Sequence, residues 1–118
     1  MAFDWTKYLA LAKEMARRPD EEAQRTAVSS AYYAAFGKAR LRLREDGVVL
    51  PRQGAHEFVW NTFQNDVDPA RQQIGIDGDR LKRIRRNADY GESFAALPAL
   101  LQSTLVRAEK LIQSLDRL

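Results

Sequence analysis

The 118-residue sequence contains no cysteine and only one histidine. Without cysteine, the chain can form neither disulfides nor thiolate metal sites. A single histidine cannot build a zinc site from several histidines, and it gives no basis for a serine–histidine–acid or cysteine–histidine active site. There is also no glycine-rich phosphate loop. The sequence therefore predicts no bound metal and no cofactor.

Long apolar runs are missing as well. The first seven residues lack the apolar core of a signal peptide, and no apolar run approaches the length that spans a membrane. We therefore expect a soluble, cytoplasmic protein with no membrane partner. The length fits a single domain over residues 1–118. The net charge of +3 permits a nucleic-acid partner without requiring one.

Apolar residues recur at helical spacing through most of the chain. This spacing predicts helices over about 4–18, 20–46, 56–65 and 79–90, and a last helix that begins near 97. No segment alternates between apolar and polar residues as a strand would. Short connections between amphipathic helices favour an all-α, antiparallel up-and-down bundle of four to five helices. We expect the second and last helices to lie at its centre.

The segment 66–78 is less regular. Pro69 is expected to open a turn of helix, which Gly75 and Gly78 would then interrupt. Asp77 and Asp79 are expected to cap the helix that follows, because acidic side chains are stabilising at a helix N-terminus. A magnesium site at these two carboxylates is the alternative.

Five basic residues fall between Arg80 and Arg86, on a helix whose other side is apolar. The helix ends in hydrogen-bonding side chains, so a phosphate or RNA site is predicted there. A merely solvated basic surface is the alternative. We expect one polar pocket, with His56 or Tyr33 at its edge, lined by Arg85, Arg86, Asn87, Asp89 and Tyr90.

His56 is the only side chain whose unperturbed pKa lies near neutrality. It could act as a general base or phosphate ligand near the basic helix. We favour a structural role, in which it starts the third helix and bonds a loop carbonyl. Tyr32 and Tyr33 diverge by about 100° around their helix. We therefore assign Tyr32 and Phe36 to the core, and leave Tyr33 open as an edge residue with an available hydroxyl.

Three short motifs resemble those of small prokaryotic HEPN-domain proteins. Residues 29–36, Ser-Ser-Ala-Tyr-Tyr-Ala-Ala-Phe, are similar to the second-helix signature of that family, and residues 85–90, Arg-Arg-Asn-Ala-Asp-Tyr, match its Arg-x-x-Ala-Asp-Tyr signature. Gly54-Ala55-His56 resembles its intervening loop. The resemblance spans about 20–118. It implies a bundle of four or five helices, often dimeric, that works with RNA or nucleotides in toxin–antitoxin, phage-defence or stress systems.

Many HEPN proteins are metal-independent ribonucleases, in which an arginine neutralises the scissile phosphate and a histidine moves the proton of the 2′-hydroxyl. Arg86 and Asn87 match the first half of that motif, but no histidine follows them. Gly37 stands where this branch usually has another histidine. The resemblance thus implies a weakly catalytic or non-catalytic module. Tyr90 matches a tyrosine that a partner nucleotidyltransferase modifies in related proteins.

Two alternatives stay open. An active endoribonuclease would use Arg85 or Arg86, with His56 or Tyr90 as the replacement base. A structural helical subunit would instead bind a partner protein, which could be a nucleotidyltransferase. The resemblance also suggests a homodimer with the basic helices near each other. The residues predicted to contact RNA or nucleotide are Arg83, Arg85, Arg86, Asn87, Asp89, Tyr90 and Tyr33.

Overall fold

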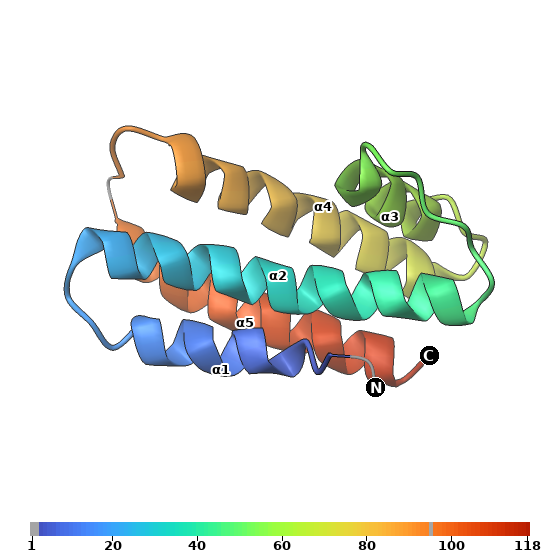
Figure 1. Cartoon of the computed structure of the whole chain (residues 1–118), viewed down its shortest axis with the longest axis horizontal. Helices are drawn as coiled ribbons and strands as arrows, with labels where there is room; N and C mark the ends of the chain where they lie inside the picture. The colour runs from blue at the N-terminus through green and yellow to red at the C-terminus, as the bar shows by residue number, and fades with distance from the viewer. Residues whose placement is uncertain (1–2, 95) are drawn as a thin grey trace.

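The computed structural model describes residues 3–94 and 96–118, which form five α-helices and no strand (Figure 1). The predicted all-α bundle is confirmed. None of these helices is both long and apolar enough to cross a membrane. The helices are α1 (Thr6–Met15), α2 (Glu21–Glu45), α3 (Ala55–Gln64), α4 (Pro69–Tyr90) and α5 (Leu97–Asp116).

The centre of the bundle is the pair α2 and α5, as the sequence predicts. These two helices pack against each other, and each also contacts α1 and α4. Helices α1 and α4 lie on opposite sides of the pair and do not pack against each other within the described residues. Figure 1 shows that α2 runs antiparallel to both α1 and α4, while the short α3 covers one end of α4. One face of α4 is therefore left exposed.

Helix ends follow local chemistry. Asp20 is the N-cap of α2, and its carboxylate accepts a hydrogen bond from the backbone N–H of Ala23. Gly47 follows the C-cap of the same helix with φ of +86°, a left-handed conformation that glycine adopts without a steric cost. Asp4 accepts a hydrogen bond from the N–H of Thr6 at the start of α1. Side-chain hydrogen bonds thus mark the start of both helices, and a glycine marks the end of α2.

Helix α4 is longer than the sequence suggests, because Gly75 and Gly78 do not interrupt it. It begins at Pro69, after the N-cap Asp68, and both glycines are buried beneath α3. A methyl group on Gly75 would lie 2.6 Å from the carbonyl oxygen of Trp60, and one on Gly78 would overlap the Trp60 indole. The prediction of a broken helix is wrong because these glycines provide close contact between helices.

The longer α4 also changes the environment of Asp77 and Asp79. Both lie in the interior of the helix, so the prediction that they cap its start is wrong. Asp79 pairs instead with Lys82 at 3.4 Å and with Arg83 at 2.9 Å, one turn further along. Asp77 accepts a hydrogen bond from the side-chain amide of Gln73 at 3.0 Å.

Candidate nucleic-acid interface

The predicted site residues lie on two different faces of α4. Successive residues of a helix diverge by about 100°, so neighbours in the sequence face different surroundings. Arg85 turns inward toward α2, whereas Arg86 is exposed. The expected single pocket is therefore not formed. The outer face of α4 carries an open hollow, referred to below as the outer hollow, which is lined by the exposed residues Arg83, Arg86, Asn87 and Tyr90.

Arg85 is held against the tyrosines of α2. Its guanidinium donates to the Asp89 carboxylate at 3.1 Å and, at 3.4 Å, to the Tyr33 hydroxyl. Its central carbon lies 5.3 Å from the ring centroid of Tyr32 and 5.6 Å from that of Tyr33, within the range of cation–π attraction. Only 13% of the side chain is exposed. Arg85 is thus a bridge between α4 and α2 rather than a surface cation.

Beside Arg85, a chain of hydrogen bonds joins α3 to α2. The indole N–H of Trp60 donates to the Tyr32 hydroxyl at 3.0 Å, and this hydroxyl lies 2.7 Å from His56 Nδ1. Since the Tyr32 oxygen already accepts from Trp60, its own proton is directed to Nδ1. Burial raises the pKa of Tyr32 well above its usual range, so the hydroxyl stays protonated and remains a donor.

His56 is therefore neutral, with Nδ1 as an acceptor and the ring proton on Nε2. Burial lowers the pKa of His56, and the nearby charges of Arg85 and Lys82 lower it further. Its ring also stacks on Phe36, with centroids 3.9 Å apart. The structural role favoured for His56 fits this setting, but its partner is the hydroxyl of Tyr32 and not a loop carbonyl.

The outer hollow has a different character. Tyr90 is 78% exposed, so both its ring and its hydroxyl face solvent. Arg86 forms no ion pair with any described residue, whereas Arg83 pairs with Asp79. Asn87 adds an exposed amide that can both donate and accept hydrogen bonds. The hollow thus combines cationic, aromatic and amide groups that are accessible to a ligand.

Tyr33 and Asp89 belong to neither the outer hollow nor the hydrophobic core. They line a separate hollow over α1, α2 and α4, together with Tyr8. Tyr33 is partly exposed, in contrast to the fully buried Tyr32, so the assignment of the two tyrosines is confirmed. The residues predicted to contact RNA or nucleotide therefore lie on separate surfaces of the protein and do not form one site.

The end of α4 is fastened by Arg25, a residue that the sequence motifs did not single out. Its guanidinium donates to the backbone carbonyls of Ala88 and Gly91, and it lies 4.9 Å from the centroid of the Phe94 ring. These bonds satisfy a carbonyl that the last turn of a helix leaves without a partner. Arg25 thereby holds in place the turn that carries Tyr90.

Gly37, which replaces the histidine expected from the resemblance, lies under Trp5. A side chain at position 37 would overlap the Trp5 indole, so this part of the bundle has no room for an imidazole. The described part of the chain also contains no group of three or more side chains that could together bind a metal ion.

Comparison with models of protein families, with curated proteins and with solved structures found no match to this chain.

The adjacent residues Arg85 and Arg86 provide a matched test of the two faces. We expect Arg85→Ala to lower the free energy of unfolding by about 1–3 kcal/mol, because it removes packing on two tyrosines and leaves Asp89 without its partner. Arg86→Ala should change it by less than about 0.5 kcal/mol, as is usual for an exposed residue. Urea denaturation measures both values. Equal losses would contradict the assignment of the two residues to different faces.

The environment of His56 predicts a pH dependence of stability. A pKa that is lower in the folded than in the unfolded chain means that unfolding takes up a proton below pH 6.5, the ordinary histidine value. The contribution of His56 to stability is therefore present above pH 6.5 and is lost as the pH falls toward its folded pKa. Denaturation midpoints between pH 7 and 5 should show this loss.

His56→Gln is the control for that experiment, because it keeps a side-chain acceptor for Tyr32 but removes the titrating ring. The variant should lose less stability than the wild type over the same pH interval. An identical pH dependence in the two proteins would show that His56 is not the group responsible.

Proposed function

We propose that this protein is an RNA-binding module of the HEPN type, with weak or no catalytic activity. The observation that supports this most strongly is the outer hollow of α4, where Arg83, Arg86, Asn87 and Tyr90 are accessible together. By the resemblance, the module would act in a toxin–antitoxin, defence or stress system in the cytoplasm. It would do so as a homodimer or with a partner protein such as a nucleotidyltransferase.

The chemistry of the hollow suits single-stranded RNA. An exposed aromatic ring such as that of Tyr90 offers a stacking surface to any unpaired base, which contributes about 1–3 kcal/mol for each base. Arg86 can neutralise a phosphate, since its charge has no partner in the described structure. The amide of Asn87 can bond to the edge of an unstacked base.

The state of His56 favours binding without efficient cleavage. A metal-independent ribonuclease needs a base that removes the proton of the 2′-hydroxyl. In His56, Nδ1 is engaged by Tyr32 and Nε2 already carries a proton. His56 also belongs to the inner cluster around Arg85, whereas the outer hollow lies on the opposite face of α4. Neither position suits a base acting at Arg86.

Salt-dependent binding of fluorescent single-stranded RNA tests this function. We expect Arg86→Ala to weaken binding and to lower the slope of log affinity against log salt by about 0.7, the value for one phosphate contact on a single strand. Tyr90→Ala should weaken binding by about 1–3 kcal/mol with the slope unchanged, because it removes stacking but no charge. Fluorescence anisotropy at several salt concentrations provides both quantities.

Arg17→Ala is the matched control, because Arg17 is an exposed arginine next to α1, a helix that does not pack against α4. It should bind RNA like the wild type. A wild-type protein that fails to bind RNA even at low salt would favour the structural-subunit alternative. RNA cleavage that persists in a chelator and disappears in Arg86→Ala would show that the protein is an active ribonuclease.

A further inference from the structure

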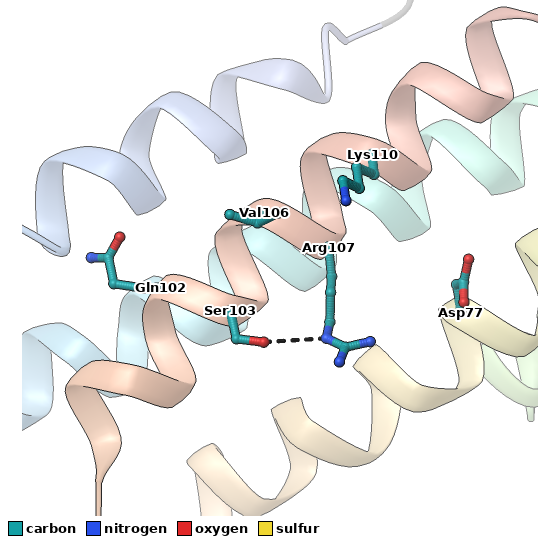
Figure 2. A pocket seen from close by; sticks show the side chains of 6 residues that line it. All are labelled: Asp77, Gln102, Ser103, Val106, Arg107 and Lys110. Carbon is teal, nitrogen blue, oxygen red and sulfur yellow. Dashed lines mark hydrogen bonds between the residues drawn. The ribbon is translucent and has the colours of Figure 1, made fainter.

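A third hollow, of about 520 Å³, lies between α4 and α5. Figure 2 shows its lining: Asp77 projects from α4, and the guanidinium of Arg107 extends from α5 toward α4. The lining residues are Asp77, Gln102, Ser103, Val106, Arg107 and Lys110. Apart from Asp77, the sequence motifs single out none of these residues.

The cations of this hollow are available to a ligand. Arg107 donates through Nε to the Ser103 hydroxyl at 3.2 Å, which orients the guanidinium while leaving its two terminal nitrogens without a side-chain partner in the described structure. Neither Arg107 nor Lys110 forms an ion pair within the described residues, and both are exposed. An oriented guanidinium with two free nitrogens suits bidentate contact with a phosphate.

A row of arginines connects this hollow to the outer hollow. Arg86, Arg83, Arg80 and Asp77 follow one another at intervals of three residues, so each is a neighbour of the next on the helix surface. Such a row winds around the helix axis, and here it leads from the exposed face of α4 to the side that faces α5. Arg80 is exposed between the two hollows. The row thus leads from the outer hollow, through the exposed Arg80, to Asp77 at the edge of the hollow between α4 and α5.

We propose that the hollow between α4 and α5 is a second phosphate-binding subsite for the same single-stranded RNA. This inference rests on the proposed function and makes it more specific: the ligand is an oligonucleotide that spans both hollows, rather than a mononucleotide. Charge complementarity supports RNA as the occupant, because the row and the hollow together place five cations beside only two carboxylates. The five cations are Arg80, Arg83, Arg86, Arg107 and Lys110, and the two carboxylates are Asp77 and Asp79.

The remaining lining also suits a nucleotide. Gln102 and Ser103 offer hydrogen-bonding groups for sugar or base edges. The side chain of Val106, a residue that is 52% exposed, offers a small apolar surface for the face of a base. Tyr90 and Asp77 are thirteen residues apart in α4, which corresponds to roughly 20 Å at 1.5 Å per residue. At about 3.4 Å per stacked nucleotide, a strand of about six nucleotides spans this distance.

Binding of oligouridylates of three and ten nucleotides to the full chain tests the second subsite. The double variant Arg107→Ala, Lys110→Ala should bind the ten-nucleotide RNA at least about fivefold more weakly, with a salt slope lower by about 1.4, as for two lost phosphate contacts. It should bind the three-nucleotide RNA like the wild type, because that ligand reaches only the outer hollow. Arg86→Ala should weaken binding of both ligands. Arg117→Ala, an exposed arginine at the end of α5, is the control.

The outcomes separate the two proposals. If the double variant binds the ten-nucleotide RNA as tightly as the wild type does, while Arg86→Ala binds it more weakly, the second subsite is overturned and the proposed function stays intact. If the double variant loses the same amount of affinity for both RNA lengths, the second subsite is also overturned. Arg107 and Lys110 would then act only through the overall positive charge of the protein. If the wild type binds no RNA, the proposed function fails as well. Tighter binding of an acidic peptide than of an RNA of equal charge would assign the hollow to a protein partner.

Discussion

The packing of Trp60 against two glycines of α4 determines how that helix is rotated about its own axis. Gly75 and Gly78 leave no side chain between the helices, so the backbone and indole of Trp60 lie directly against α4. The same indole donates its N–H to Tyr32 in α2. One residue of the short α3 thus fixes the position of α4 relative to the centre of the bundle.

This rotation decides what each basic residue of α4 can do. Arg85 turns inward, where two tyrosine rings and Asp89 hold it, whereas Arg86 turns outward with its charge unpaired among the described residues. A rotation of α4 by one residue, about 100°, would bring Arg86 to the position that Arg85 now occupies. The inner arginine bridges α4 and α2, whereas the outer arginines remain exposed. The proposed RNA-binding surface therefore follows from helix packing as much as from net charge.

The sequence predicts the fold well, because each helix carries a repeated apolar stripe and recognisable ends. Asp20 before α2 and Pro98 in the first turn of α5 are local signals that mark where these two helices begin. Such local signals could not predict that α4 is one continuous helix. A glycine lowers helix propensity, but whether it breaks a helix depends on what packs on it. Here the packing residue is Trp60, which belongs to another helix and lies more than ten residues before both glycines.

The candidate site was predictable only in part. The residues of the basic helix are evident from composition, and the 100° separation of neighbours is known for any helix. Which of Arg85 and Arg86 faces inward depends on contacts with Tyr32 and Tyr33, more than fifty residues earlier. The partner of His56 is likewise a long-range contact. Arg107 and Lys110 belong to no motif, and only the packing of α5 beside α4 brings them near the basic row.

The most direct test of the two-face arrangement is an NMR titration that follows the arginine side-chain Nε–H signals while a ten-nucleotide single-stranded RNA is added. The two-face arrangement predicts that the signals of Arg86 and Arg107 shift progressively, while that of the enclosed Arg85 stays in place. Large shifts at Arg85 and in the His56 ring, with Arg86 and Arg107 unaffected, would contradict it. That result would locate the ligand at the inner cluster instead of the outer surface of α4.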